Sequence, residues 1–429
     1  MSSQHLHLVE EKQLHSDIYT SKAVFEHEMT HLFHKAWVYV GHESQVPNTG
    51  DYLSTRIGDS PVIMVRNKDK NIHVLMNRCA HKGARLVSEP SGNLGKMLRC
   101  PYHAWAYRFD GSLLSIPMKR EYEDTGFEEC PAAKGLSTAG AVEVYRGFVF
   151  ARLSPEGVGF HEYFGDVLSA LDTMADSSPE GELEVVGGGL RSQIRCNWKL
   201  YLENVNDTVH PISTHESAYS SAEKAADSFE DLDPLSLEQL LPFGSNYDFY
   251  SEMGVKTFKN GHSVLGTKFS IHTGYAEIEG YKEQIEQAHG VERANEILNF
   301  TPQNVIFYPS MAAKGSPQIL RVLRPVAVDE THLEVWVFQP KGASEKLAQR
   351  GLSYSRLVYS PMSVVAHDDI HLFESQQINL QAAGNKWVNL CRQYNADEGA
   401  QDNHEFQDAN NELVLRNQYR AWRSLMGSN

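Results

Sequence analysis

The most informative stretch of the chain is residues 201–217, which read Tyr-Leu-Glu-Asn-Val-Asn-Asp-Thr-Val-His-Pro-Ile-Ser-Thr-His-Glu-Ser. Four polar side chains that can hold a metal fall close together within it: Asn204, Asp207, His210 and His215. If the first part is helical, Asn204, Asp207 and His210 recur at every third position and lie broadly on one side. The stretch therefore predicts a metal site.

A proline and two histidines narrow the geometry of this site and the choice of metal. Pro211 cannot continue a helix comfortably, so we expect the chain to break there and to bring His215 back toward His210. Two neutral imidazoles on adjacent turns suit Fe, Zn, Cu or Ni rather than Mg or Ca. The choice among these four metals depends on the rest of the chain.

The overall composition is that of an acidic globular protein. The chain has 429 residues, which is enough for two domains or more, and its formal net charge is -16. Nucleic acid and anionic membranes call for clustered Lys and Arg, so this charge argues against both as partners. An anionic substrate would need a local basic group.

The N-terminus and the cysteines indicate where the protein works. The N-terminus shows neither an apolar core region nor an Arg-rich amphipathic pattern, and no stretch approaches about 18 consecutive apolar residues. The cysteines are odd in number: Cys79, Cys100, Cys130, Cys196 and Cys391. An odd count without an export signal predicts a reduced, cytoplasmic protein.

Hydrophobic periodicity divides the chain into three parts. Residues 1–36 have helix-compatible spacings, whereas residues 37–155 read as short strands separated by turn residues, which predicts a small β domain. The remainder, residues 156–429, is expected to be α+β. Three elements are expected within it: a helix at 281–298, a hairpin at 318–338 and a C-terminal helix at 410–426.

Two cysteine–histidine pairs lie at turns of the predicted β domain. Cys79-Ala-His81 and Cys100-Pro-Tyr-His103 are separated by 18 residues, and two loop tips of this kind can converge on one metal group. A Cys2His2 zinc site and a Rieske [2Fe–2S] cluster are the options, because two histidines replace two cysteines on one iron of a Rieske cluster. Zinc sites usually pair Cys with Cys and His with His. Since each loop supplies one of each, the pattern favours the cluster over zinc and over two unrelated pairs.

These motifs resemble those of a known enzyme family. Residues 79–83 (Cys-Ala-His-Lys-Gly) and 100–105 (Cys-Pro-Tyr-His-Ala-Trp) are similar to the Rieske motif of the Rieske non-haem iron aromatic-ring-hydroxylating dioxygenases. Residues 203–215 (Glu-Asn-x-x-Asp-x-x-His-x-x-x-x-His) resemble the mononuclear iron motif of their large (alpha) subunit. The resemblance runs from about Trp37 to the C-terminus. Lys82 stands where an arginine is usual, and the spacer is slightly long, but neither departure removes a ligand.

The resemblance implies an α+β fold in which both motifs have their own domain. A small all-β Rieske [2Fe-2S] domain (37–155) would be inserted before a larger helix-on-antiparallel-sheet catalytic domain (156–429) of the helix-grip, START-like type. Residues 1–36 would form an N-terminal helical segment packing on the catalytic domain. The two cysteine–histidine pairs would hold the cluster.

The resemblance also implies where a third iron ligand lies. Two histidines need a carboxylate to complete the facial triad of a non-haem Fe(II) oxygenase, and the family takes it from an acidic pair followed by Glu five residues on. The pair Asp368-Asp369 with Glu374 fits. We therefore expect Asp369 to bind iron with His210 and His215, with Asp368 as the runner-up. Without the histidines, the pair would be interpreted as exposed carboxylates at a helix start.

Asp207 is then free for another task. A carboxylate beside a metal-bound imidazole fixes its tautomer and raises its basicity. The resemblance implies that Asp207 links His210 to His103 of the partner subunit, so that electrons cross between chains. The alternative is an acceptor for N–H groups of its own helix neighbours. Asn204 is expected to orient near the iron without binding it, and Glu203 is as well explained as a structural carboxylate.

The predicted function is that of a terminal oxygenase alpha subunit in aromatic compound catabolism. A Rieske centre and one Fe(II) can each store one of the two electrons that O2 addition to a ring needs. The chain has no Gly-x-Gly-x-x-Gly opening a βαβ unit, so NADH or NADPH is expected to act through a partner reductase, with or without a ferredoxin. The resemblance implies an alpha3 homotrimer or an alpha3beta3 assembly with a small beta subunit.

The substrate is expected to be a small aromatic molecule, first of all an aromatic acid, and second a neutral arene or aryl amine. Arg321, or Lys314, is a candidate anchor for a carboxylate, although basic residues on strands are more often solvated or paired. Tyr359 and Val365 are candidate substrate contacts. An apolar pocket is expected to be lined by residues near the iron ligands and by two further segments, 304–313 and 359–365.

Three other functions share part of this pattern. A Rieske monooxygenase that removes O- or N-methyl groups would use the same metals. A pure electron carrier is disfavoured by the motif at 203–215, because carriers need no open iron. A zinc-stabilised binding protein would contain stoichiometric zinc and no visible absorption.

Overall fold

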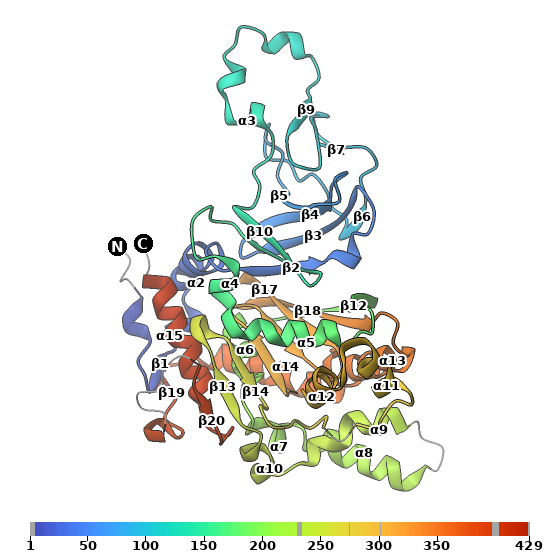
Figure 1. The fold of residues 1–429 in the computed structure, drawn as a ribbon. Helices are drawn as coiled ribbons and strands as arrows, with labels where there is room; N and C mark the ends of the chain where they lie inside the picture. Colours follow the sequence, from blue (N-terminus) through green and yellow to red (C-terminus); the bar gives the residue numbers. More distant parts are fainter. Residues whose placement is uncertain (1–4, 230–233, 274, 301, 397–402, 428–429) are drawn as a thin grey trace. The chain divides into compact units, whose positions relative to one another are not determined.

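The computed structural model describes residues 5–229, 234–273, 275–300, 302–396 and 403–427. These residues form two compact units, of which the smaller spans Phe33–Val158. The larger combines Met1–Leu32 with Gly159–Asn429 (Figure 1). The larger unit is therefore built from both ends of the chain, and the smaller unit is an insertion between them.

The smaller unit is built from antiparallel sheets with the strand orders β5-β4-β3-β6, β10-β11-β2 and β7-β8-β9. Its strands are β2 (Val38–His42), β3 (Asp51–Ile57), β4 (Ser60–Arg66), β5 (Ile72–Met76), β6 (Ser91–Asn93), β7 (Leu98–Arg99), β8 (Ala106–Tyr107), β9 (Leu113–Ser115), β10 (Ala141–Tyr145) and β11 (Phe148–Arg152). Its short helices are η3 (Glu43–Gln45), η4 (Lys119–Tyr122), η5 (Phe127–Glu129) and α3 (Pro131–Lys134). The short strands that the sequence predicts here are present.

The hairpin of β3 and β4 shows how residue type determines the local structure of this unit. Strands β3 and β4 are joined by a two-residue turn, because Ile57 pairs with Ser60. Gly58 in this turn has a φ of 55°, a left-handed conformation that glycine adopts without a steric cost. Further along β4, Ile63 and Val65 are two residues apart, so their side chains lie on the same face of the strand. Both pack in the buried core of the unit.

The larger unit contains an antiparallel sheet with the strand order β12-β18-β17-β16-β15-β14-β13-β20. Its strands are β12 (Leu183–Ile194), β13 (Val255–Thr257), β14 (Ser263–Leu265), β15 (Asn304–Phe307), β16 (Met311–Lys314), β17 (Ile319–Ala327), β18 (Glu330–Pro340) and β20 (Glu405–Phe406). A separate pair consists of β1 (Gln13–His15) and β19 (Trp387–Asn389).

Helices surround this sheet, and α6, α13 and α14 contact strands β17, β18 and β12 respectively. The α-helices are α1 (Asp17–Thr20), α2 (Lys22–Glu28), α4 (Phe160–Phe164), α5 (Ser169–Asp176), α6 (Trp198–Asn204), α7 (His210–Thr214), α8 (Glu216–Ser228), α9 (Pro234–Leu240), α10 (Tyr247–Glu252), α11 (Tyr281–His289), α12 (Val291–Asn299), α13 (Glu345–Tyr354), α14 (Val364–Asn379) and α15 (Leu413–Gly427). The 3-10 and π turns are η1 (Leu6–Leu8), η2 (Met29–Phe33), η6 (Gly165–Leu168), η7 (Leu241–Gly244), η8 (Lys259–Gly261), η9 (Ser355–Tyr359) and η10 (Tyr394–Ala396). Helices on an antiparallel sheet are the architecture that the sequence predicts.

Two expected helices need correction. Residues 1–36 are not helical throughout, because Gln13–His15 forms a strand that pairs with Trp387–Asn389, far along the chain. The helix expected at 281–298 is two helices, α11 and α12. They separate at Gly290, whose φ of 80° is outside the helical region. The expected hairpin at 318–338 is present as β17 and β18.

A buried ion pair ties the N-terminal helices to the rest of the larger unit. Glu28 on α2 is fully buried, and Lys199 on α6 donates to it at 2.6 Å. The indole N–H groups of Trp198 and Trp422 donate to the same carboxylate at 3.0 and 2.8 Å. Because the carboxylate has partners from α6 and α15, it joins three helices that are distant in sequence.

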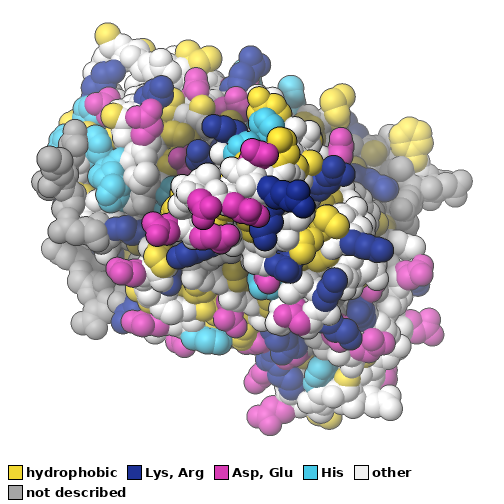
Figure 2. Space-filling view, turned by 90° about the horizontal axis from the view of Figure 1, so that it is seen from above, with side chains coloured by type: hydrophobic (Ala, Val, Ile, Leu, Met, Phe, Trp, Pro, Cys, Tyr) yellow, Lys and Arg dark blue, Asp and Glu magenta, His cyan; other side chains and the backbone are white. Residues whose placement is uncertain are grey.

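The surface carries charges of both signs. On the face drawn in Figure 2, acidic and basic side chains are interspersed, and hydrophobic side chains lie in separate patches. Within the described ranges, no helix is long and apolar enough to cross a membrane.

Candidate metal centres

The two cysteine–histidine loops of the smaller unit share one backbone pattern. Each cysteine N–H donates to the carbonyl five residues on, from Cys79 to Ala84 and from Cys100 to Trp105, both at 2.8 Å. Each cysteine carbonyl accepts from the residue four positions on, which is Gly83 or Ala104. These two residues are left-handed, with φ of 74° and 56°. Two similar closed loops therefore present Cys-x-His and Cys-x-x-His.

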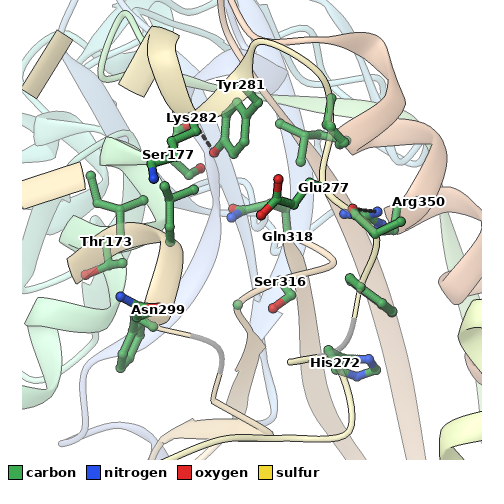
Figure 3. Close-up of a pocket in the computed structure, with 18 of the residues that line it drawn as sticks. Thr173, Ser177, His272, Glu277, Tyr281, Lys282, Asn299, Ser316, Gln318 and Arg350 are labelled. Carbon is green, nitrogen blue, oxygen red and sulfur yellow. Dashed lines mark hydrogen bonds between the residues drawn. The ribbon is translucent and has the colours of Figure 1, made fainter. Parts of the chain in front are cut away.

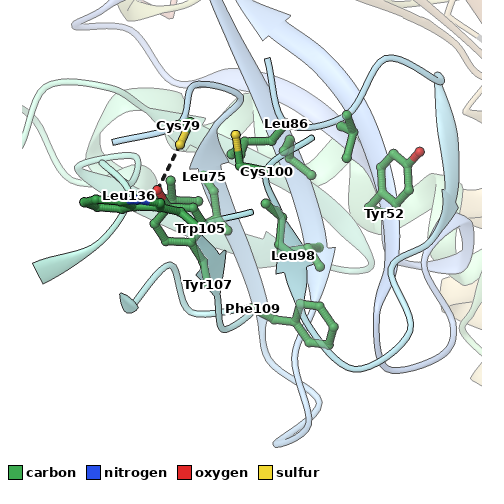
Figure 4. Close-up of a cluster of buried hydrophobic side chains, with 13 residues drawn as sticks. Tyr52, Leu75, Cys79, Leu86, Leu98, Cys100, Trp105, Tyr107, Phe109 and Leu136 are labelled. Atoms are coloured by element: carbon green, nitrogen blue, oxygen red, sulfur yellow. Dashed lines mark hydrogen bonds between the residues drawn. The ribbon is translucent and has the colours of Figure 1, made fainter. Parts of the chain in front are cut away.

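The ligand atoms of these loops divide between the interior and the surface. Cys79 and Cys100 are 3% and 2% exposed and lie in the apolar core of the unit (Figure 4). The rings of His81 and His103 are 4.6 Å apart, and His103 is exposed. Buried thiols on one side and imidazoles on the other suit a Rieske cluster, in which the two irons have different ligands. The residues therefore fit the group that the motif predicts.

Neighbouring side chains hold both kinds of ligand in place. The Tyr107 hydroxyl lies 3.1 Å from the Cys79 Sγ and accepts a hydrogen bond from the Ala80 N–H at 3.2 Å. Burial, together with Cys79, raises the pKa of Tyr107, which keeps its hydroxyl protonated. The His81 ring stacks on Trp105 with centroids 4.8 Å apart. Burial and the charges of His103 and Lys82 lower the pKa of His81, which favours a neutral imidazole.

In the larger unit, residues 201–217 fold differently from the expectation. Helix α6 ends at Asn204, and a new helix, α7, begins at His210 with Pro211 in its first turn. The break therefore lies before His210, because proline is favourable at a helix start, where its missing N–H costs nothing. Asn204, Asp207 and His210 do not share one helix. His215 follows α7 and turns back, as expected.

Three side chains of this unit converge as metal ligands could. One nitrogen each of His210 and His215 and one oxygen of Asp369 lie within 4.8 Å of one another. The Nε2 atoms of the two histidines lie 3.8 and 3.5 Å from the Asp369 Oδ1. Asp368 lies outside this group, with its Oδ2 4.0 Å from the His215 Nδ1. Two nitrogens and one carboxylate oxygen are the donors of a facial triad, so the residues fit a mononuclear iron.

The protonation states of His215 and Asp369 are suited to binding a cation. Burial lowers the pKa of His215 to about 3, so the ring is neutral and can act as a ligand. Burial also raises the pKa of Asp369 to about 6, although the charge of His210 and a hydrogen bond from Asn204 oppose the rise. A cation between these groups would return Asp369 to the ionised state. Asn204 Nδ2 donates to the Asp369 Oδ1 at 3.2 Å and so orients it.

Asp207 fixes the orientation of His210. Its Oδ2 lies 3.1 Å from the His210 Nδ1 and accepts the backbone N–H groups of Val209 and His210 at 3.1 and 2.7 Å. The other oxygen accepts from Arg392 Nη2 at 2.8 Å. Burial alone would raise the pKa of Asp207, but His210 and Arg392 outweigh burial and hold it well below its usual range.

Sequence patterns did not indicate Arg392 or the partners of Glu203. Arg392 comes from the segment that follows β19, and no motif surrounds it. The Glu203 carboxylate accepts hydrogen bonds from Tyr19 at 2.9 Å and from Tyr419, which places it in the structural core. Burial raises the pKa of Glu203 to about 7, although the two tyrosines oppose the rise.

The predicted substrate contacts lie on strands and helices near this group. Arg321 on β17 is buried, and its guanidinium lies 4.9 Å from the centre of the Tyr359 ring. Val365 is buried in the first turn of α14, the helix that carries Asp369. Lys314 at the end of β16 is also buried.

A cavity of about 680 Å³ opens elsewhere in the larger unit (Figure 3). Its lining includes His272, Ser316, Gln318 and Arg350, and none of the predicted substrate contacts. Both ring nitrogens of His272, the Ser316 Oγ and the Gln318 Oε1 are buried without a hydrogen-bond partner among the described residues. No sequence pattern predicts this cavity, because its walls come from several separate segments.

Comparisons with known proteins cover both units. Residues 36–136 match the model of the Rieske [2Fe-2S] domain, and residues 174–428 match the model of the ring hydroxylating alpha subunit (catalytic domain). The chain is 32% identical to the anthranilate 1,2-dioxygenase large subunit of Acinetobacter baylyi, over 88% of this chain and 79% of that protein. It is 29% identical to the 2-halobenzoate 1,2-dioxygenase large subunit of Burkholderia cepacia over the same shares.

A solved structure shows the same fold. Naphthalene 1,2-dioxygenase with indole bound in the active site aligns with a TM-score of 0.79, covering 100% of this chain and 95% of that one. The sequence identity is 22%.

Proposed function

The chain belongs to the ring-hydroxylating dioxygenase alpha subunits, and on that premise we propose that it adds O2 to the ring of an aromatic carboxylate. The family carries a Rieske [2Fe–2S] cluster and a mononuclear iron, and its members work as multimers with reductase and ferredoxin partners. The observation that supports the proposal best is the group of His210, His215 and Asp369, three suitable donors within 4.8 Å.

The ligand sets are part of this proposal. The smaller unit would hold the cluster through Cys79, His81, Cys100 and His103. An iron ion held by the facial triad would supply O2 binding and activation at the positions that the triad leaves open. Asp207 keeps the His210 Nδ1 engaged, so that its Nε2 is directed to the metal. Asn204 holds the Asp369 carboxylate in the same way.

Electrons would come from NADH or NADPH through a reductase, with or without a ferredoxin, in the cytoplasm. We propose that Asp207 also links His210 to His103 of the partner subunit in an alpha3 or alpha3beta3 assembly. Within the chain, Arg392 already occupies one oxygen of Asp207. An incoming imidazole N–H would therefore share this carboxylate with Arg392.

The proposed substrate class rests on the names of three relatives and on the buried side chain of Arg321. The names of three relatives contain aromatic acids: anthranilate, 2-halobenzoate and toluate. Arg321 lies close enough for its charge to act on Asp369, and we propose it as the carboxylate anchor, with Tyr359 and Val365 as further contacts. A guanidinium suits a carboxylate because its N–H groups match the two oxygens.

Anaerobic reduction followed by turnover tests this function. The purified protein should contain about three irons per chain, two in the cluster and one mononuclear. With a surrogate reductase it should oxidise members of an aromatic acid panel, and labelled O2 should place two oxygen atoms in the product. Stoichiometric zinc without visible absorption would contradict the proposal.

A demethylase is the second candidate, because one relative has such a name. The chain is 34% identical, over 58% of its length, to the N,N-dimethyl phenylurea N-demethylase subunit alpha of a Sphingobium species. A demethylase would release formaldehyde and incorporate one labelled oxygen atom. The same labelling experiment therefore separates the two reactions.

A further inference from the structure

Two buried cations lie on one face of neighbouring strands in the larger unit. Lys314 on β16 is 1% exposed, and Arg321 on β17 is 4% exposed. Ala312 pairs with Arg321 across these strands, and Lys314 is two residues from Ala312. Because side chains alternate along a strand, Lys314 and Arg321 point to the same face as diagonal neighbours.

Neither Lys314 nor Arg321 forms an ion pair among the residues that the structure describes, and the hydrogen bonds recorded for them go to neutral groups. The other buried cations of this unit are all ion-paired: Lys199 with Glu28, Arg324 with Glu334, Arg350 with Glu238 and Arg416 with Glu412. Two adjacent unpaired cations are therefore exceptional here, and burying such charges is costly.

The hydrogen-bond acceptors of Lys314 and Arg321 are neutral groups, and they leave some N–H donors of both side chains unused. Lys314 Nζ donates to the Gln303 carbonyl at 3.1 Å, which leaves two of its three donors. Arg321 Nη2 donates to the Asn304 Oδ1, while its Nε has no acceptor among the described residues. Both side chains therefore have N–H donors that can form a hydrogen bond with a further acceptor.

Two tyrosine rings hold the cationic groups in position. Lys314 Nζ lies 5.2 Å from the centre of the Tyr354 ring, and Arg321 lies 4.9 Å from the centre of the Tyr359 ring. The two rings are 5.3 Å apart. Ring faces attract cations but supply no carboxylate, so these contacts do not replace an ion-pair partner. Burial and the charge of Arg321 hold the pKa of Lys314 well below its usual range, which favours the neutral amine while no anion is bound. A substrate carboxylate beside Lys314 would favour the ammonium form.

The pair has neighbours on two sides. The charge of Arg321 acts on Asp369, which places it near the metal ligands. At the other end, the Tyr354 ring is 4.9 Å from the His272 ring, and His272 lines the cavity (Figure 3). An acid group that binds Arg321 would also lie beside Lys314, because the two side chains are diagonal neighbours on one face.

We propose that Lys314 and Arg321 together form a two-cation subsite that receives the ionised acid group of the substrate. Lys314 is then a residue that determines specificity, in addition to the anchor Arg321. This inference rests on the proposed oxygenation of an aromatic acid. The substrate carboxylate would supply the ion-pair partner that no described residue provides to Lys314 or Arg321.

Kinetics with a matched substrate pair tests the subsite. The best acid of the panel and its primary amide have nearly the same shape, but only the acid is charged. Lys314→Met and Arg321→Met should each raise the KM for the acid by about ten- to a hundredfold, the range for a hydrogen bond to a charged group. The KM for the amide should change by less than about twofold. Arg356→Met, which removes an exposed cation from the turn between Tyr354 and Tyr359, should leave both values unchanged.

Thermal unfolding of the reduced, anaerobic protein gives a readout without turnover. The acid should raise the melting temperature of the wild type but not that of Lys314→Met. Without ligand, Lys314→Met should be at least as stable as the wild type, because a buried amine beside another cationic side chain has been replaced by an apolar group. If this variant does not fold, Lys314→Gln, which keeps a donor for the Gln303 carbonyl, replaces it.

The outcomes separate the subsite from the proposed function. Equal rises in KM for acid and amide, or no rise in either, would overturn the subsite. If the wild type oxidises the amide or a neutral arene and the variants have the same KM values as the wild type, the proposed ring oxygenation is supported and the subsite is wrong. If the wild type oxidises no aromatic compound, the proposed function itself is wrong.

Discussion

The Cys–His loops of the smaller unit and the His–Asp group of the larger unit place their ligands by different means. Each loop closes on itself through two backbone hydrogen bonds and needs few distant contacts. The His–Asp group depends on α7 and α14, which are far apart in sequence, and on charged neighbours such as Asp207 and Arg392. The first site is local and apolar, whereas the second is long-range and charged. The second should therefore be more sensitive to changes elsewhere in its unit.

Removing one ligand from each site should have the largest effect. Asp369→Ala should reduce the iron content from about three to about two per chain and abolish turnover, while the visible spectrum of the cluster remains. Cys100→Ala should reduce it to about one iron and abolish the visible spectrum. Metal analysis and absorption spectra measure both. Asp368→Asn is the control, since Asp368 lies outside the group, and loss of iron from it would show that the wrong carboxylate was assigned.

Breaking a distant ion pair should affect the larger unit alone. Lys199→Met leaves the Glu28 carboxylate buried without its ion-pair partner, which should lower the free energy of unfolding of this unit by about 3–5 kcal/mol. The denaturant concentration at which the cluster absorption is lost should not change. Lys22→Ala, which breaks an exposed pair with Glu26, should cost less than about 1 kcal/mol. Equal shifts of both transitions would contradict the independence of the two sites.

Neutralising Asp207 should slow the passage of electrons without emptying either site. Asp207→Asn keeps the shape of the side chain but removes the charge that faces His210 and Arg392. We expect oxidation of the reduced cluster during a single turnover to slow by about 10–100-fold, with iron content unchanged. Arg392→Gln, which leaves the Asp207–His210 contact in place, should slow it less. If Asp207→Asn loses iron, its role is limited to holding the ligand.

The smallest effect is expected from a single hydroxyl beside the cluster. Tyr107→Phe removes the group 3.1 Å from the Cys79 Sγ, and hydrogen bonds to cluster sulfurs raise the reduction potential. A loss of about 1.5 kcal/mol corresponds to a decrease of about 60 mV for one electron. Redox titration measures it. Tyr122→Phe makes the same change elsewhere in the unit, and an equal decrease in this control would rule out a specific effect of Tyr107.

The differences between expectation and structure follow the same division between local and distant contacts. The two Cys–His loops were recognisable because the residues that close each loop are neighbours in sequence. The strand Gln13–His15 was missed because its partner, Trp387–Asn389, lies near the other end of the chain. In residues 201–217 the sequence predicts a helix break at Pro211, whereas the structure has the break before His210, because proline is favourable in the first turn of a helix.

By itself, the sequence determined the family, the fold class and the residues that carry the metal motifs, and the comparisons confirm the family and the fold class. These conclusions follow from spacing and residue type, which chemistry restricts locally. Only the tertiary structure placed Asp369 rather than Asp368 in the group with His210 and His215, brought Arg392 to Asp207, and left Lys314 and Arg321 buried without an ion-pair partner among the described residues. The physical reason is that burial and charge pairing depend on which distant segments meet, and no local pattern in the chain records those meetings.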